Sequence, residues 1–337
     1  MKVVVLYGNS TSQDLSLFEI ENEWQRAAAL ADIPLVMRHY ETFPTPEEFN
    51  SLVDKDADAL LGVWITDRFL NKKFYDSHPD LTYIAGLAHG FQQIDWKQSR
   101  DRGITITNTP YGEYTIAEYA FSLLLEICKK TETSCRYVKN TDWNAANDKP
   151  YTFAITRQIE LYKKTLGVVG LGKIGLHSAE IGRAFGMHVL GYNRHRKDDS
   201  EYSFIEQVPL DELFMKSDVI TLHVSLNTET EHMIDRAAFE KMKDGVIIIN
   251  TARGALIDEN ALCDALKSGK VYAAGLDVLT NEPPESGNPL IACSNALITP
   301  HIAWLPKTCR LRQISMAVET YRSYLDGKPV NVINGKF

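Results

Sequence analysis

Few folds accommodate the glycine-rich turn that lies near the middle of the chain. Residues 164–169 form an apolar segment typical of a strand, and Gly170-Leu171-Gly172-Lys173-Ile174-Gly175 follows it directly. A helical pattern and a second strand, expected over 188–192, come next. This order is typical of a dinucleotide site, where the glycines allow a tight turn, a close approach of the pyrophosphate and close packing of the helix. An ordinary turn is the alternative, but the flanking elements favour phosphates bound at the helix N-terminus.

Three other apolar segments each lead into an ionisable residue. Arg253 closes the apolar segment 246–252, and His301 comes after Leu297-Ile298-Thr299-Pro300. Glu282 stands in the segment 277–283, just past another apolar stretch. Ligands of parallel α/β sheets bind at the carboxyl ends of the strands, where these three side chains could hold an anionic substrate, orient an imidazole and move a proton. Each residue alone could be a solvated surface charge. Together, beside a dinucleotide motif, they indicate an active site.

With these motifs the chain resembles the D-isomer-specific 2-hydroxyacid dehydrogenases over nearly its whole length. The cofactor loop is 170–175, and the arginine motif is Asn250-Thr251-Ala252-Arg253-Gly254. The glutamate motif is 277–283, the histidine motif is 299–301, and the spacing from Arg253 to Glu282 (282 − 253 = 29) also agrees. The stretches 300–304 and 327–332 are most similar to the glycerate dehydrogenase or hydroxypyruvate reductase branch.

The chain of 337 residues is long enough for two α/β domains with parallel sheets, because strands and helical patterns alternate along it. The resemblance implies that both domains are doubly wound. One is a Rossmann-type dinucleotide-binding domain over residues 109–305, and the other is a flavodoxin-like, discontinuous substrate domain over residues 1–108 plus 306–337. The stretch 141–157 resembles part of the family's dimerisation arm, which implies a homodimer.

Composition limits the partners and the location of the protein. The net charge of −8 argues against nucleic acid as a partner, because neutralising phosphates requires a basic face. No apolar run is long enough for a membrane span or a signal peptide. The five cysteines are scattered and lack CxxC spacing, so free thiols in a reducing cytoplasm are expected rather than a zinc site or a disulfide framework.

The family pattern implies a catalytic role for each of the three ionisable residues. His301 would exchange a proton with the oxygen of the substrate, because an imidazole changes charge near neutral pH. Glu282 would hydrogen-bond the other ring nitrogen, and Arg253 would bind the substrate carboxylate through two parallel hydrogen bonds. Hydride transfer needs position and electrostatics from the protein, so no metal site is expected.

The resemblance also implies contacts with the substrate and the nicotinamide. The turn that contains His89 and Gly90 would bind the substrate carboxylate through backbone N–H groups, although His89 could equally be an ordinary turn histidine. Asp277 would lie near the carboxamide or cap its own turn. The remaining cofactor contacts are assigned to Ile116, Thr251 and Ala252.

The end of the strand at 188–192 bears on the choice of cofactor. NAD sites usually place a carboxylate there to bind the ribose 2′-hydroxyl. This chain instead has Asn193, Arg194 and Arg196, and no carboxylate before Asp198. The two arginines could bind a 2′-phosphate, so NADP(H) is favoured and NAD(H) is possible. A solvated basic loop is the alternative.

Reduction of a small 2-oxo acid is therefore the expected activity, with hydroxypyruvate or glyoxylate as the leading substrate. D-lactate and phosphoglycerate dehydrogenase activities remain open within the family. A different class of function also remains, because corepressor-like proteins of this fold bind peptides under the control of a dinucleotide. Turnover of 2-oxo acids would distinguish an enzyme from such a binding protein.

Overall fold

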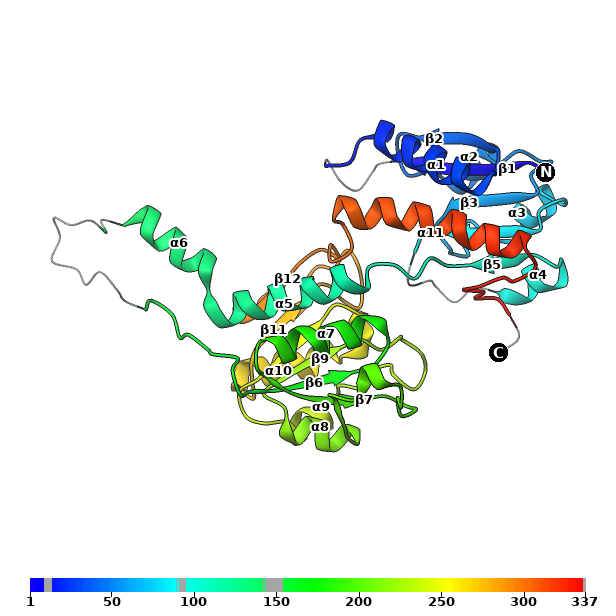
Figure 1. Ribbon diagram of the computed structural model, residues 1–337. Helices are drawn as coiled ribbons and strands as arrows, with labels where there is room; N and C mark the ends of the chain where they lie inside the picture. The colour runs from blue at the N-terminus through cyan, green and yellow to red at the C-terminus, as the bar shows by residue number, and fades with distance from the viewer. Residues whose placement is uncertain (9–13, 89, 91–94, 142, 144–153, 336–337) are drawn as a thin grey trace. The chain divides into compact units, whose positions relative to one another are not determined.

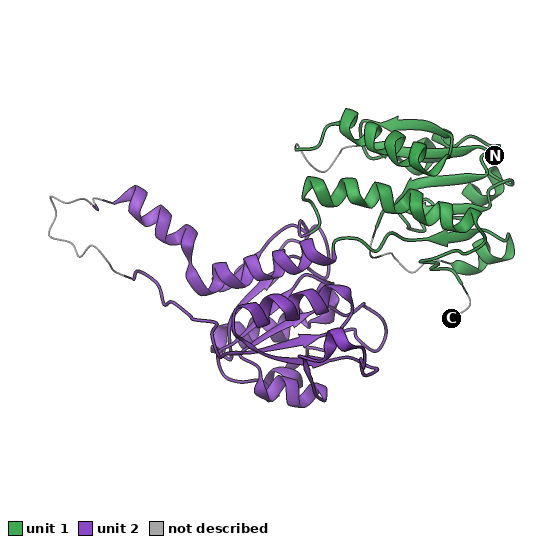
Figure 2. Ribbon diagram, viewed as in Figure 1, with its two compact units in different colours: residues 1–112, 304–337 green, residues 113–303 purple. Residues whose placement is uncertain are grey.

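The computed structural model describes residues 1–8, 14–88, 90, 95–141, 143 and 154–335 (Figure 1). The chain divides into two compact units (Figure 2). Unit 1 comprises Met1–Gly112 and Trp304–Phe337, and unit 2 comprises Glu113–Ala303. None of the helices in the described part of the chain is long and apolar enough to cross a membrane.

Unit 1 is built on a five-stranded parallel sheet of order β2-β1-β3-β4-β5. This order is that of flavodoxin-like folds, which confirms the fold class expected for the substrate domain. The strands are β1 (Val3–Gly8), β2 (Leu35–Tyr40), β3 (Ala59–Val63), β4 (Tyr83–Gly86) and β5 (Thr105–Thr107).

Helices cover both faces of this sheet, because alternate residues of each strand point to opposite sides. Val3 and Val5 pack with α1 and α11, whereas Val4 and Leu6 pack with residues of α2, α3 and α4. Helix α11 belongs to the C-terminal segment, so unit 1 is discontinuous in sequence. The helices are α1 (Leu17–Ala31), α2 (Pro46–Leu52), α3 (Lys72–Ser77), α4 (Trp96–Asp101) and α11 (Lys307–Leu325).

Unit 2 is built on a seven-stranded parallel sheet of order β12-β11-β10-β9-β6-β7-β8. If β6 is counted as strand 1 and β12 as strand 7, the order read from β8 is 3-2-1-4-5-6-7. The first six of these strands therefore have the Rossmann order 3-2-1-4-5-6. The strand order reverses between β6 and β9, where such sheets bind ligands. The strands are β6 (Thr165–Val169), β7 (His188–Tyr192), β8 (Glu206–Gln207), β9 (Val219–Leu222), β10 (Val246–Asn250), β11 (Val271–Leu276) and β12 (Ala296–Ile298).

Two apolar cores enclose the sheet of unit 2. Leu166 and Val168 pack with α5 and α7 on one face, and Val169 and Ile248 pack with α8, α9 and α10 on the other. The helices are α5 (Glu113–Lys129), α6 (Thr131–Asn140), α7 (Lys173–Ala184), α8 (Leu210–Lys216), α9 (Arg236–Lys241) and α10 (Glu259–Ser268). Two short 3₁₀ helices complete the unit, η1 (Ser200–Tyr202) and η2 (Gly254–Leu256).

Candidate active site

The glycine-rich turn joins β6 to α7 at the point where the strand order reverses. Gly170 has a φ of +99°, and a Cβ at Gly175 would lie 1.9 Å from the carbonyl oxygen of Gly170. Gly172 differs, because a Cβ there would meet no atom within 4 Å. No side chain caps α7 at Gly172. The first and third glycines are therefore required by the fold, whereas the second borders open space beside the helix N-terminus.

The other residues of the turn have different surroundings. Leu171 is buried in the core beneath α7, whereas Lys173 is exposed and Ile174 is half-buried at the first turn of the helix. The N–H of Leu171 donates to Oδ1 of Asn193, at 3.1 Å. Asn193 thus stabilises the turn from the end of β7, the position where an NAD site usually has a carboxylate.

The basic residues after β7 are exposed and paired with carboxylates. Arg194 forms an ion pair with Glu229, and Nε of Arg196 lies 3.1 Å from Oδ1 of Asp198. The sequence offered no signal for the first pair, because Glu229 lies 35 residues further along the chain, in the loop after β9. The carboxylate that Arg194 contacts is therefore not part of the sequence motif after β7.

Arg253 lies directly after β10 at the start of η2, and an asparagine holds its backbone. Asn250, which is buried, accepts a hydrogen bond from the N–H of Ala252 at 2.9 Å and donates one to the carbonyl of Arg253 at 2.8 Å. Nη1 of Arg253 donates to the carbonyl oxygen of Ala252 at 2.6 Å. Asn250 belongs to the arginine motif, but its part in shaping this turn was not foreseen from the sequence.

Glu282 and His301 form a direct hydrogen bond in the structure. Oε2 of Glu282 lies 2.7 Å from Nδ1 of His301, and Oε1 accepts from the N–H of Leu279 at 2.9 Å. Burial by itself would raise the pKa of Glu282. The hydrogen bonds from His301 and Leu279, together with the charges of His301 and Arg253, outweigh that effect and lower the pKa. The carboxylate is thus ionised beside the imidazole at neutral pH.

A buried aspartate holds the turn that carries His301. Oδ1 of Asp277 accepts from the Thr299 hydroxyl at 2.6 Å and from the Ile302 N–H at 2.9 Å, and Oδ2 accepts from the Ala303 N–H at 2.8 Å. Burial raises the pKa of Asp277, and these hydrogen bonds oppose the shift. The carboxylate thus accepts hydrogen bonds from residues before and after His301 in the chain, and these bonds fix the position of the histidine.

The remaining predicted residues lie in different parts of the chain. Ile116 is half-buried in the first turn of α5, and the hydroxyl of Thr251 is buried without a hydrogen-bond partner among the described residues. A bound molecule at the carboxyl end of β10 could supply that partner. Gly90 follows β4 in unit 1, and His89 lies outside the described residues.

No group of three or more His, Cys, Asp or Glu side chains suited to a metal ion occurs in the described part.

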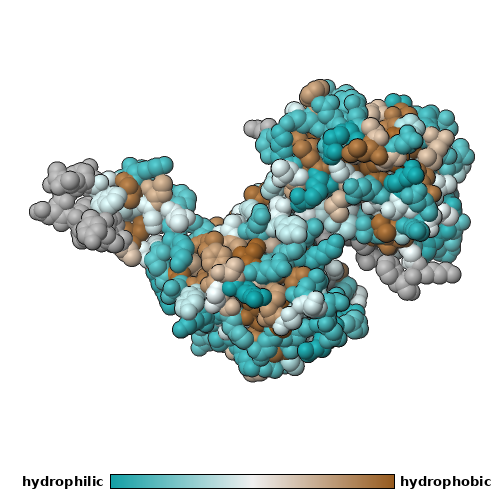
Figure 3. Space-filling view, viewed as in Figure 1, coloured by the Kyte–Doolittle hydropathy of each residue, from teal (hydrophilic) through white to brown (hydrophobic). Residues whose placement is uncertain are grey.

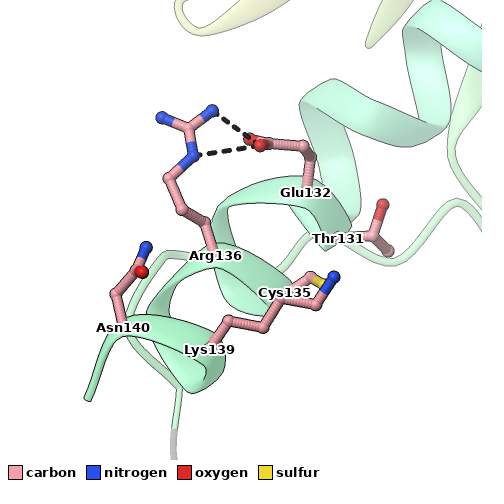
Figure 4. Close-up of a pocket in the computed structure, with 6 residues that line it drawn as sticks. All are labelled: Thr131, Glu132, Cys135, Arg136, Lys139 and Asn140. Atoms are coloured by element: carbon pink, nitrogen blue, oxygen red, sulfur yellow. Dashed lines mark hydrogen bonds and ion pairs between the residues drawn. The ribbon is translucent and has the colours of Figure 1, made fainter.

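Two surface depressions lie apart from these residues. The first is on α6, where the Arg136 guanidinium binds Glu132 through Nε at 3.0 Å and Nη2 at 2.6 Å (Figure 4). Its lining consists of Thr131, Glu132, Cys135, Arg136, Lys139 and Asn140. The second depression lies beside α7 and η1. Neither contains a predicted site residue.

Known proteins resemble the chain in both sequence and structure. The family model for the NAD-binding domain of D-isomer specific 2-hydroxyacid dehydrogenases matches residues 121–303. A hydroxypyruvate reductase of Blautia hydrogenotrophica is 36% identical over 99% of this chain and all of that protein. A glyoxylate reductase of Korarchaeum cryptofilum is 36% identical over 83% of each chain. The solved structure of an acyclic imino acid reductase (Bsp5) in complex with NADPH and D-Arg has a TM-score of 0.78 at 29% identity, with 98% of this chain and 99% of that chain covered.

Two glycine substitutions should separate folding from phosphate binding. Gly175→Ala places a methyl group against the backbone of Gly170, so we expect a loss of about 1–3 kcal/mol in the free energy of unfolding. Gly172→Ala meets no atom and should change stability by less than about 0.5 kcal/mol. It should nevertheless weaken dinucleotide binding at least tenfold by filling the open space. Urea denaturation and fluorescence titration with NADPH measure the two effects, and unchanged affinity in Gly172→Ala would contradict this role.

The lowered pKa of Glu282 predicts an acid-sensitive contribution to stability. A carboxylate whose pKa is lower in the folded chain stabilises it above the ordinary value of 4.5, and this contribution is lost as the pH falls through the folded-state pKa. Glu282→Gln removes that titration, so the stability advantage of the wild type at pH 7 should shrink as the pH falls below this ordinary value. Asp277 has an opposite shift, but both proteins contain it. Urea denaturation of both proteins across this range provides the measurement, and a constant difference would contradict the prediction.

Proposed function

The chain belongs to the D-isomer-specific 2-hydroxyacid dehydrogenase family and is an NAD(P)-dependent 2-hydroxyacid oxidoreductase, and we propose that it acts mainly as a reductase of hydroxypyruvate or glyoxylate. The observation that carries this proposal is the 2.7 Å hydrogen bond between Glu282 and His301, which provides an oriented acid for a 2-oxo group. The names of the hydroxypyruvate and glyoxylate reductases support the substrate class.

His301 serves as the acid that protonates the carbonyl oxygen of the substrate. Its Nδ1 faces Glu282, so the proton is exchanged through Nε2. The ionised Glu282 fixes the tautomer and the orientation of the ring. Reduction consumes the proton of His301, whereas oxidation of the hydroxy acid requires a neutral imidazole that accepts one.

Arg253 binds the substrate and polarises its carbonyl group. A guanidinium presents several N–H donors in one plane, which suits a carboxylate and the adjacent carbonyl oxygen. The hydrogen bonds of Asn250 hold the turn around Arg253, so the donors are ordered before the substrate arrives. We also propose, from the family pattern, that His89 and Gly90 contribute to binding the substrate carboxylate.

Unit 2 holds the dinucleotide in this proposal. When bound, the nicotinamide supplies a hydride to the carbonyl carbon or accepts one from the hydroxy acid. The open space at Gly172 would accommodate the pyrophosphate, and the backbone N–H groups at the start of α7 would donate hydrogen bonds to it. The buried hydroxyl of Thr251 offers a hydrogen bond to the cofactor beside Ala252, and Ile116 offers an apolar contact to the nicotinamide.

Initial rates with four 2-oxo acids test the substrate proposal. We expect hydroxypyruvate or glyoxylate to be reduced at least tenfold faster, in kcat/KM, than pyruvate or phosphohydroxypyruvate. Each substrate is assayed with NADPH and with NADH, and consumption of the reduced cofactor is followed by absorbance. Faster turnover of pyruvate would favour a D-lactate dehydrogenase, and faster turnover of phosphohydroxypyruvate would favour a phosphoglycerate dehydrogenase. Dinucleotide binding without any turnover would favour a peptide-binding scaffold.

Replacement of His301 tests the assignment of the acid. We expect His301→Ala to lower kcat by about 10²–10⁴ in both directions, because general acid–base catalysis contributes that much. His188→Ala is a matched control, since His188 is an exposed histidine at the start of β7. The wild-type rate of reduction should fall at high pH and the rate of oxidation at low pH. Near-wild-type turnover of His301→Ala would exclude the assignment.

The ion pair between Arg194 and Glu229 suggests how the cofactor is chosen. Asn193 carries no charge to repel a 2′-phosphate, and its side chain is engaged with Leu171 and with the carbonyl of His195. Arg194 lies next to it and is exposed, so it can exchange the carboxylate of Glu229 for a phosphate. We therefore propose a preference for NADP(H), moderated by Glu229, with NAD(H) also accepted.

Opposite changes at this ion pair should shift the cofactor preference in opposite directions. We expect Arg194→Ala to raise the KM for NADPH roughly tenfold, because a hydrogen bond to a charged group contributes about 1.5–3 kcal/mol. Glu229→Gln should lower that KM by releasing Arg194. Arg236→Ala removes another exposed Arg–carboxylate pair and serves as the control. The KM for NADH should change little in all three variants, and an NADH preference in the wild type would contradict the proposal.

The assembly we propose is a homodimer formed through the arm that includes α6. None of the residues of α6 is buried, and Val138 and Trp143 are 40% and 41% exposed. Apolar residues interrupt the hydrophilic surface along this part of unit 2 (Figure 3). Most of the stretch 141–157 that was predicted to contribute lies outside the described residues. Sedimentation velocity of the full chain measures its mass, and a monomer at micromolar concentration would contradict the dimer.

The cytoplasm is the location we propose. All five cysteines are free in the structure, as they are in a reducing compartment. Cell fractionation with an antibody against the chain tests this location.

A further inference from the structure

Two cysteines that are distant in sequence lie against each other in unit 2. Sγ of Cys263, on α10, is 3.4 Å from Sγ of Cys293, which precedes β12. Both thiols point towards the carbonyl oxygen of Pro289, at 3.6 Å and 3.4 Å. The two residues are 3% and 8% exposed, so a small oxidant has only a narrow approach to them. Neither cysteine is among the residues proposed for catalysis.

We propose that Cys263 and Cys293 are a modification site that forms a reversible intramolecular disulfide when the protein meets a peroxide. A disulfide has an S–S distance of about 2.05 Å, so the sulfur atoms need to approach by little more than about 1 Å. In a reducing compartment the bond forms under oxidative stress and is then reduced by thiols.

Hydrogen bonds already hold the two segments together next to the cysteines. Glu259, at the start of α10, accepts from the N–H of Thr280 at 2.7 Å and from Nδ2 of Asn288, also at 2.7 Å. These bonds link α10 to the segment that ends at Cys293. The disulfide therefore reinforces an existing arrangement, in which the thiols meet without unfolding of the unit.

Lys267 lies beside one thiol of the pair. It is exposed and lies four residues after Cys263 on α10, on the same side of the helix. A hydrogen bond with the Cys263 side chain raises the pKa of Lys267, so the ammonium lies beside the sulfur of Cys263. Burial raises the pKa of Cys293, which therefore remains a thiol. Cys263 is thus the attacking residue of the pair.

The oxidation proceeds in two balanced steps with hydrogen peroxide as oxidant. The Cys263 thiolate attacks one peroxide oxygen, so an S–O bond forms, the O–O bond breaks and hydroxide leaves as Cys263 becomes a sulfenic acid. Cys293 then loses its proton and attacks the sulfur of Cys263, so the S–S bond forms and the S–O bond breaks. Two thiols and one peroxide give one disulfide and two waters, with two electrons passing from the sulfurs to the peroxide.

The test uses the full chain with Cys135→Ser, because exposed Cys135 could form bonds between molecules. Five cysteines less Cys135 leave four thiols. We expect hydrogen peroxide to reduce the thiol count of the denatured protein from four to two, and dithiothreitol to restore it. Tryptic peptides should be cross-linked between Cys263 and Cys293, with the mass lower by two hydrogens. The cross-link closes a segment of 30 residues (293 − 263), so Tm should rise by several degrees.

Further cysteine and lysine variants decide whether this pair is responsible. Cys263→Ser and Cys293→Ser, each with Cys135→Ser, should lose the cross-link and the rise in Tm. Cys309→Ser, which also replaces a buried cysteine, should keep both. Lys267→Gln should slow the oxidation several-fold, whereas Lys270→Gln should not, because Lys270 binds Asp244.

Three outcomes would overturn the proposal: four thiols that persist in peroxide, oxygen adducts at these cysteines without a cross-link, or an equally abundant cross-link between other cysteines. Each readout is independent of turnover, so failure of the disulfide and failure of the proposed reductase activity remain distinguishable.

Discussion

The buried carboxylate of Asp277 organises the site around His301. It accepts hydrogen bonds from Thr299 on one side of the histidine and from Ile302 and Ala303 on the other. His301 itself has a φ of +55°, a conformation that is uncommon for residues other than glycine and needs support from its surroundings. Burial raises the pKa of Asp277 and so works against its charge, and the three hydrogen bonds offset part of that cost. The orientation of the imidazole towards Glu282 depends on this arrangement.

The order of strands in unit 2 explains why the ionisable residues gather. β10, β11 and β12 are neighbours in the sheet, and all three run parallel. Arg253 follows β10, Glu282 follows the strand beside it, and His301 follows the third strand. Parallel strands end at the same edge, so three segments separated by tens of residues deliver a cation, a carboxylate and an imidazole to one region. The same edge carries the glycine-rich turn after β6.

The cofactor end of the unit combines rigid and exchangeable interactions. Gly170 and Gly175 leave no room for a side chain, and Asn193 ties the turn to β7. Arg194 and Glu229 are exposed and form an ion pair of a kind that typically contributes about 0–1 kcal/mol, so a phosphate can replace the carboxylate at little cost. The rigid turn and the exchangeable ion pair are the two features behind our proposal that the enzyme prefers NADP(H) and also accepts NAD(H).

The amino-acid sequence by itself determined the alternation of strands and helices, the glycine-rich turn and the placing of Arg253, Glu282 and His301 at strand ends, because each depends on local periodicity or on residues close together in the chain. The doubly wound arrangement followed from the resemblance to the family, since strand order is not a local property. Only the tertiary structure decided the contacts between segments that are distant in the chain: Asp277 with the turn of His301, Arg194 with Glu229, and Cys263 with Cys293. The partners in these pairs are 22, 35 and 30 residues apart. Their meeting depends on strand order, helix packing and the direction of each side chain, and no local pattern of residues specifies these.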